Sequence, residues 1–256
     1  MTVSRVILVR HGESTANVAA TAAEAAGLET IAVETRDADV PLSPLGRQQA
    51  AALSERLSAV VDDSPRIWSS PYRRAIETAQ LALGAEVPLI IDERLRDREL
   101  GILDALTSRG VDARLPAEAA RRRWVGKFYY RPPGGESWTD VALRLRSFLR
   151  DALTPTRPDV VDGGPGGPAP TRSGSTLVVF AHDAVVSLVR YILLGYTEQE
   201  LEEFLLTRVV ANASVTTLLL DASAVWRVET FSDDRHLQEA GLPTTEHQGA
   251  ARVEAN

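Results

Sequence analysis

Short apolar runs alternate along the chain with longer stretches in which apolar residues recur every three or four positions. The short runs are typical of buried β-strands and lie at residues 6–9, 67–68, 89–91 and 176–181. Residues 214–220 and 225–230 predict a further pair of strands. The longer stretches predict helices at about 13–26, 43–61, 70–83, 116–125, 136–153, 183–194 and 197–206. Strands that alternate with helices predict an α/β fold of three layers, a mostly parallel central sheet with helices on both faces.

The chain is expected to form a single domain over residues 1–256. Ten of the twenty residues at 155–174 are Gly or Pro, which predicts a flexible loop. Because the apolar strand at 176–181 needs a sheet to join, this loop is not expected to separate two domains. From about residue 232 the chain is polar, and we expect a loosely held tail with His236 and His247 on its surface.

Composition narrows the classes of function. The chain has 44% hydrophobic residues, enough for a sizeable core, and no Cys, which excludes disulfides, thiolate catalysis and Cys-ligated metal sites. Its formal charge of −7 argues against a general nucleic-acid or anionic-membrane binder. No apolar stretch approaches the ~20 residues of a membrane span, and the run at 6–9 is too short for a signal peptide. A cytoplasmic location is therefore expected.

Basic and histidine side chains directly follow three of the predicted strands. Arg10 and His11 follow the first strand, Arg73 and Arg74 the second, and His182 the strand at 176–181. Ligands of open α/β sheets bind beyond the carboxyl ends of the strands, where helix N-termini also favour anions. The sequence therefore places two histidines and at least two arginines at one anion site.

These residue types suit phosphoryl transfer. Arginine matches phosphate oxygens with paired hydrogen bonds, and neutral histidine is a competent nucleophile toward phosphorus. Because arginine and histidine supply the positive charge, neither a metal nor another cofactor is expected. Two other interpretations of the histidines are weaker. The histidines could be structural, or they could bind a metal with Glu13 and Asp183, although this spacing fits no zinc pattern.

Six segments together resemble the histidine phosphatase superfamily, also called phosphoglycerate mutase-like. The segments occur in the family's order and are Leu8-Val9-Arg10-His11-Gly12-Glu13-Ser14, Asp39-Val40-Pro41-Leu42-Ser43-Pro44-Leu45-Gly46-Arg47-Gln48-Gln49-Ala50, Ser69-Ser70-Pro71-Tyr72-Arg73-Arg74-Ala75-Ile76-Glu77-Thr78-Ala79, Leu95-Arg96-Asp97-Arg98-Glu99-Leu100-Gly101, Gly134-Gly135-Glu136-Ser137 and Val179-Phe180-Ala181-His182. The resemblance covers most of the chain and implies the family's fold together with phosphatase or mutase activity.

The resemblance also implies a role for individual residues. His11 would become phosphohistidine, and the phosphoryl oxygens would be bound by Arg10, Arg74, His182 and Asn17. Arg74 is preferred to Arg73 because it directly precedes alanine in the motif. Asp97, four residues before the motif glycine, would be the proton donor, with Glu99 as the alternative. Ser14 and Glu13 are candidates for phosphate or substrate binding, although Ser14 is also placed to cap a helix.

Two departures from the family pattern bear on the activity. Asp183 stands where the family usually has Gly after the second histidine, and a carboxylate there would repel phosphate unless it points away or pairs with arginine. The loop at 19–38 lacks an element similar to the mutase branch, which favours hydrolysis.

We therefore expect a phosphomonoester hydrolase that acts on a small phosphorylated substrate. The alternatives are phosphoglycerate mutase-type transfer and a catalytically weak phosphate-binding protein. The late strand pair at 214–230 could offer a sheet edge for pairing of two copies, which leaves a homodimer open.

Overall fold

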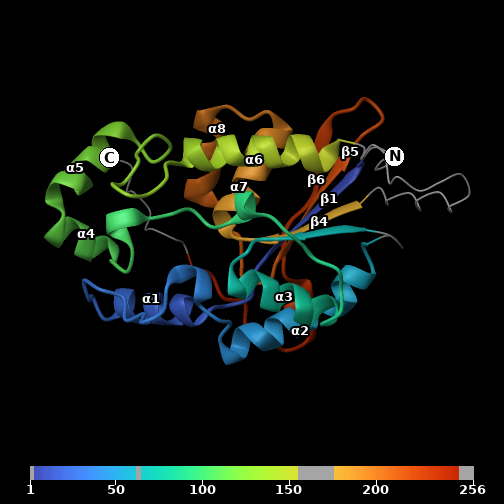
Figure 1. Ribbon diagram of the computed structural model, residues 1–256, viewed down its shortest axis with the longest axis horizontal. Coiled ribbons are helices and arrows are strands. Elements are labelled where there is room, and N and C mark those ends of the chain that lie inside the picture. The colour runs from blue at the N-terminus through green and yellow to red at the C-terminus, as the bar shows by residue number, and fades with distance from the viewer. Residues whose placement is uncertain (1–2, 62–64, 155–175, 248–256) are drawn as a thin grey trace, which may run out of the picture.

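Six strands form one mixed sheet in the part of the chain that the computed structural model describes, residues 3–61, 65–154 and 176–247 (Figure 1). The strands are β1 (Arg5–Arg10), β2 (Arg66–Ser69), β3 (Ile90–Ile91), β4 (Thr176–Ala181), β5 (Val215–Leu220) and β6 (Trp226–Asp233). They pair in the order β3-β2-β4-β1-β5-β6, with the first four parallel and the last two antiparallel. The predicted α/β fold is confirmed.

Helices cover both faces of this sheet. The helices are α1 (Thr15–Ala25), α2 (Pro44–Ser58), α3 (Arg73–Leu83), α4 (Ser108–Arg114), α5 (Pro116–Val125), α6 (Trp138–Leu153), α7 (Asp183–Leu194), α8 (Glu198–Thr207) and α9 (Arg235–Glu239). Figure 1 shows α6, α7 and α8 on one face, α2 and α3 on the other, and α4 and α5 in a separate group near α1. The three layers that the sequence predicts are therefore present.

The buried strands supply both hydrophobic cores because successive side chains point to opposite faces. Val6 and Leu8 of β1 lie in the core beneath α6 and α7, whereas Ile7 and Val9 lie in the core beneath α2 and α3. Strand β4 is buried along its whole length and divides its side chains in the same way. This two-sided burial explains why the central strands read as continuous apolar runs.

Side-chain caps fix where two of the longer helices begin. The Ser43 hydroxyl accepts a hydrogen bond from the Gly46 N–H at the start of α2, where Pro44 is the first helical residue. Ser137 caps α6 in a capping box with Asp140, so this helix begins two residues after the predicted position. Most of the predicted helices agree with the structure at this accuracy.

Two expectations concern irregular regions. The first, a loose C-terminal tail, needs correction, and the second falls on residues that the structure does not describe. The described residues 232–247 are not a loose tail, because they include the end of β6 and helix α9, and Leu237 is buried in the core beneath α2. His236 is also buried rather than on the surface. The sequence of this region did not predict the contacts, because α9 is mostly polar and Leu237 is its one apolar side chain in the core. The predicted loop at 155–174 lies outside the described residues.

Truncation of Leu237 tests the packing of this C-terminal region. Leu237→Ala removes a side chain that is 0% exposed, so we expect the free energy of unfolding to fall by about 2–5 kcal/mol. The control is Leu143→Ala, whose side chain is 66% exposed and whose loss should change stability by less than about 0.5 kcal/mol. Urea unfolding followed by circular dichroism measures both. Equal stability of the two variants would contradict the packed C-terminal region.

Candidate active site

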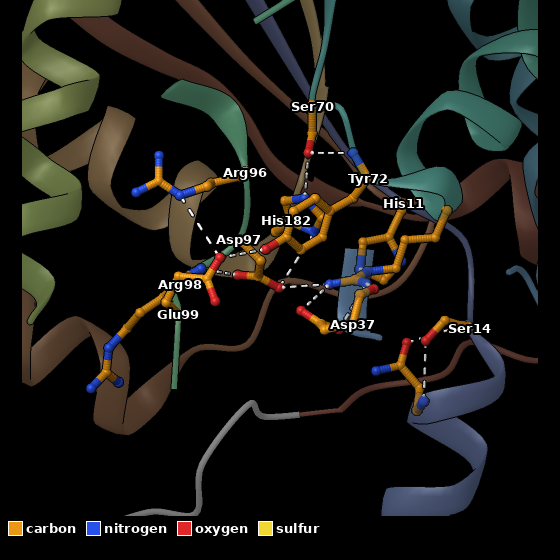
Figure 2. A network of polar contacts seen from close by, with 12 residues as sticks. His11, Ser14, Asp37, Ser70, Tyr72, Arg96, Asp97, Arg98, Glu99 and His182 are labelled. Carbon is orange, nitrogen blue, oxygen red and sulfur yellow. Dashed lines mark hydrogen bonds and ion pairs between the residues drawn. The ribbon is translucent and has the colours of Figure 1, made fainter. Parts of the chain in front are cut away.

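The carboxyl ends of β1, β2 and β4 bring three polar residues to one edge of the sheet. The His11 N–H donates to Ala181 O at 3.0 Å, and the Ser70 N–H donates to Phe180 O at 2.9 Å. These bonds extend the parallel ladders by one residue beyond each strand. The rings of His11 and His182 therefore lie close together (Figure 2), with their centroids 5.2 Å apart.

His11 is held in one tautomer by its own loop. Its Nδ1 lies 2.7 Å from Gly12 O, which can only accept, so Nδ1 carries the proton. Arg74 Nε donates to His11 Nε2 at 3.3 Å, which requires an unprotonated Nε2. The lone pair of Nε2 is therefore the nucleophilic group that His11 offers.

Close backbone contact fixes the loop that carries His11. The Gly12 N–H donates to Thr78 Oγ1 at 3.0 Å, which ties the loop to α3. A Cβ atom added at Gly12 would lie 2.4 Å from Gly46 O, and one at Gly46 would lie 1.9 Å from Glu13 O. Only glycine permits this approach of the His11 loop to the start of α2.

His182 is completely buried and oriented by Ser70. His182 Nε2 lies 2.8 Å from Ser70 Oγ, and the same Ser70 oxygen accepts from the Tyr72 N–H at 3.2 Å. Donation by the Ser70 hydroxyl to Nε2 places the ring proton on Nδ1, which lies 3.4 Å from Asp97 Oδ2. His182 can therefore present an N–H donor on the side where Asp97 lies.

Arg74 connects the nucleophile to two carboxylates. Its guanidinium contacts Asp37 through Nη1 at 2.9 Å and Asp97 through Nη2 at 3.2 Å, in addition to His11. The side chain of Arg74 is buried, and its guanidinium lies 4.9 Å from the centroid of the Tyr72 ring. The neighbouring Arg73 instead pairs with Glu77 at the surface, so the structure brings Arg74 rather than Arg73 to the site.

Arg10 is anchored by main-chain oxygens from the C-terminal part of the chain. Its Nη1 donates to Val210 O, and its Nη2 donates to His247 O at 2.8 Å. Arg10 is buried, and its Nε has no hydrogen-bond partner among the described residues. This anchored guanidinium lines the same cavity as His11 and Arg74.

Asp97 lies on a loop that Arg144 of α6 holds in place. The Arg144 guanidinium donates to the carbonyl oxygens of Arg94, Arg96 and Asp97 at 2.5–3.0 Å. The Asp97 carboxylate is thereby directed toward Arg74 and His182 (Figure 2). Glu99, two residues later, accepts from the Tyr72 hydroxyl at 2.9 Å.

The remaining predicted site residues differ in their placement. Ser14 and Asn17 line the cavity and also form the capping box of α1. Asn17 Oδ1 accepts from the Ser14 N–H, so the amide nitrogen is the group that Asn17 can offer to phosphate. Glu13 does not line the cavity, because its carboxylate accepts from the Ser43 hydroxyl at 2.6 Å and serves the contact with α2.

A cavity of about 230 Å³ adjoins these groups and includes residues that the sequence did not single out for it. Asp37 enters it from the loop before α2, and His247 enters it from the C-terminal segment, contrary to the surface position expected. Asp183 also lines the cavity, and its carboxylate accepts a hydrogen bond from the Ser187 hydroxyl. Neither Asp37 nor His247 carries a local sequence signal, since both reach the site through long-range contacts.

Burial and nearby positive charges keep the imidazole rings of His11 and His182 neutral. The pKa of His11 lies well below its usual value because of burial and then the positive charge of Arg74, and the pKa of His182 is lowered by the same two causes. Burial raises the pKa of Asp37, against the opposing effect of Arg74. The site thus combines neutral imidazoles with fixed guanidinium charge, which is what nucleophilic attack on phosphorus requires.

The described residues hold no group of three or more His, Cys, Asp or Glu side chains arranged to bind a metal ion. Every described helix is also too short or too polar to cross a membrane.

Comparison with known proteins gives consistent matches. The family model of the histidine phosphatase superfamily (branch 1) matches residues 6–234. A glucosyl-3-phosphoglycerate phosphatase of Mycolicibacterium vanbaalenii is 34% identical over 197 residues, which cover 76% of each chain. Phosphoglycerate mutase-like protein 4 of Arabidopsis thaliana is 28% identical over 93% of this chain and 89% of its own length. The structure of a mycobacterial glucosyl-3-phosphoglycerate phosphatase with VO3 superimposes with a TM-score of 0.66 at 28% identity, covering 90% of this chain and 99% of the other.

The lowered histidine pKa values predict a specific response to acid. Nitrogen NMR of the imidazoles should show His11 and His182 still neutral at pH 6, whereas the urea-unfolded chain should titrate near its ordinary value of about 6.5. Because only the unfolded state then takes up these protons, the free energy of unfolding should fall as the pH drops below about 6.5. Protonation of both rings near pH 6.5 in the folded protein would refute this.

Proposed function

The chain belongs to the histidine phosphatase superfamily and is a phosphatase of phosphate monoesters, and from this premise we propose that it acts through a phosphohistidine at His11. The observation that carries the proposal is the tautomer of His11, whose unprotonated Nε2 meets Arg74 at the cavity. A small phosphorylated molecule is the proposed substrate. A cytoplasmic location and pairing of two copies stay predictions.

In the first step, His11 Nε2 attacks phosphorus in line with the ester oxygen, so that a P–N bond forms as the P–O bond breaks. Arg10, Arg74, His182 and Asn17 hold the three non-bridging oxygens. Hydrogen bonds from these side chains would stabilise the negative charge of the transition state once phosphate replaces the carboxylate partners of Arg74. The Nδ1–H bond to Gly12 O supports the positive charge that develops on the His11 ring.

Asp97 is proposed as the proton donor because its carboxylate reaches the groups around the phosphate. In the free protein it lies 3.2 Å from Arg74 Nη2 and 3.4 Å from His182 Nδ1. A dianionic phosphate that takes over these donors would lie beside the Asp97 carboxyl group. Asp97 would then protonate the departing alcohol oxygen.

The second step returns the free enzyme. Asp97, now ionised, takes a proton from water as the water oxygen attacks phosphorus and the P–N bond breaks. The products are inorganic phosphate, neutral His11 and protonated Asp97. Hydrolysis rather than transfer to a second alcohol agrees with the names of the mycobacterial relatives.

Removal of the nucleophile should abolish turnover. His11→Ala is expected to lower kcat for an aryl phosphate by about 10³-fold or more, because the P–N bond can no longer form. Rapid acid-free quenching of the wild-type protein with ³²P-labelled ester should trap a protein-bound label that His11→Ala lacks. Circular dichroism checks that the variant is folded. Retained turnover or retained label in folded His11→Ala would rule out His11.

The two candidate proton donors can be separated by the leaving group of the substrate. Asp97→Asn should lower kcat for an alkyl phosphate by about 10²–10⁴-fold and affect p-nitrophenyl phosphate far less, because nitrophenolate departs without a proton. Glu99→Gln is the matched control and should change both rates by only a few fold, since Glu99 bonds to the Tyr72 hydroxyl. If Glu99→Gln alone produced the leaving-group dependence, Glu99 would be the donor.

A further inference from the structure

The cavity extends beyond the phosphate-binding groups to the place where the alcohol part of an ester would lie. Its walls come from residues 31–37, residues 97–105 and the start of α7, with Trp138 of α6 beside them. The cavity volume of about 230 Å³ leaves room for an alcohol group beside the phosphate. The side chains on these walls therefore contact the part of the substrate that distinguishes one ester from another.

Carboxyl groups outnumber cations among the residues that line the cavity. The carboxyl groups are those of Asp37, Asp97, Glu99, Asp104 and Asp183. The cations are Arg10, Arg74 and Arg98. Arg10 and Arg74 are the phosphate ligands of the proposed reaction, which leaves Arg98 as the cation for the alcohol part. Arg98 already donates through Nε to the main-chain oxygen of Glu136 at 2.7 Å.

Asp183 sets the charge balance between the phosphate groups and the alcohol part. It is the first residue of α7, and its Oδ1 accepts from the Ser187 hydroxyl at 3.3 Å. No basic side chain of the described residues lies within salt-bridge distance of it. Its negative charge acts to raise the pKa values of two cations, Arg10 and Lys127. The Nζ atom of Lys127 lies 5.0 Å from the centre of the Trp138 ring. The negative charge of Asp183 thus offsets the positive charge of Lys127, which could otherwise attract a second anionic group of the substrate.

The rest of the wall suits a hydroxylated carbon skeleton. Ile31, Val33, Leu100 and the Trp138 ring provide apolar surface beside the carboxyl groups. Carboxyl oxygens accept hydrogen bonds from hydroxyl groups, whereas apolar and aromatic surfaces pack against C–H groups. A neutral polyol satisfies both kinds of wall at once.

We propose that Asp183 is a specificity-determining residue that makes this cavity select phosphate esters of neutral, hydroxylated alcohols, such as sugar or polyol phosphates, over esters whose alcohol part carries a carboxylate. The proposal rests on the proposed phosphatase function. It sets this protein apart from the substrate in the names of its mycobacterial relatives, because a phosphoglycerate contains a carboxylate. The two carboxylates, one of the ligand and one of Asp183, would repel each other in a partly enclosed site.

The preference for esters of neutral alcohols over esters that carry a carboxylate should increase as the pH rises. Burial and the neighbouring Asp97 carboxylate raise the pKa of Asp183, while Arg10 and Lys127 act in the opposite direction. Burial also raises the pKa of Asp37 across the cavity. As the pH falls, a growing fraction of these carboxyl groups is neutral and repels a carboxylate weakly, whereas their ionisation at higher pH adds the repulsion. A purely structural role of Asp183 would not produce this dependence.

A matched pair of esters tests the proposal. Glycerol 3-phosphate and 3-phosphoglycerate differ by a hydroxymethyl group in place of a carboxylate, and both are measured as competitive inhibitors of p-nitrophenyl phosphate hydrolysis. We expect the wild-type protein to bind glycerol 3-phosphate at least about tenfold more tightly at pH 8, with a smaller ratio at pH 5.5. Asp183→Asn should reduce the pH 8 ratio by about fivefold or more through tighter binding of 3-phosphoglycerate.

The control variant is Asp112→Asn, which removes a carboxylate from a surface pair with Arg123 and should leave the ratio unchanged. A wild-type ratio near or below one, or an unchanged ratio in Asp183→Asn, would overturn the proposal, as would a failure of both esters to inhibit. Loss of p-nitrophenyl phosphate hydrolysis by the wild-type protein would instead contradict the proposed function, which separates the two failures.

Discussion

The parallel pairing of β1 and β2 with β4 is the constraint on which the active site depends. Each strand ends at the same edge of the sheet, and the main-chain bonds from His11 to Ala181 and from Ser70 to Phe180 fix the residues that follow. A shift of one residue in either register would turn the alternate side chains away from their cores and move a histidine out of the site. The hydrophobic burial of both faces of β4 therefore also secures the catalytic geometry.

Within this frame, the placement of charge follows from the cost of burial. Arg74 is buried, and a buried guanidinium needs partners, which Asp37, Asp97 and His11 Nε2 provide in the free protein. A bound phosphate can replace the carboxylates as a partner of Arg74. In the proposed reaction, the same exchange leaves the Asp97 carboxyl group beside the bound phosphate.

The chemistry and the choice of substrate reside in different parts of the fold. The two histidines and Arg74 follow the ends of strands or begin a helix, whereas Asp97 and much of the cavity wall come from loops, from the start of α7 and from the C-terminal segment that reaches Arg10 through His247. Such loops can vary without loss of the sheet. Asp183 is an exception, since it directly follows His182 and also lines the cavity.

The sequence by itself determined the order of strands and helices, the two histidines and two arginines of the site, and the family, because periodicity, caps and motifs are local properties of the chain. It placed α5 and α7 at their observed bounds but did not predict α4 or α9, whose few turns carry little periodic signal. Only the tertiary structure decided that Asp37 pairs with Arg74, that Glu13 serves the contact with α2, and that the C-terminal segment packs against the core. These contacts join residues far apart in the chain, and their free energy arises from burial and charge that no single segment contains.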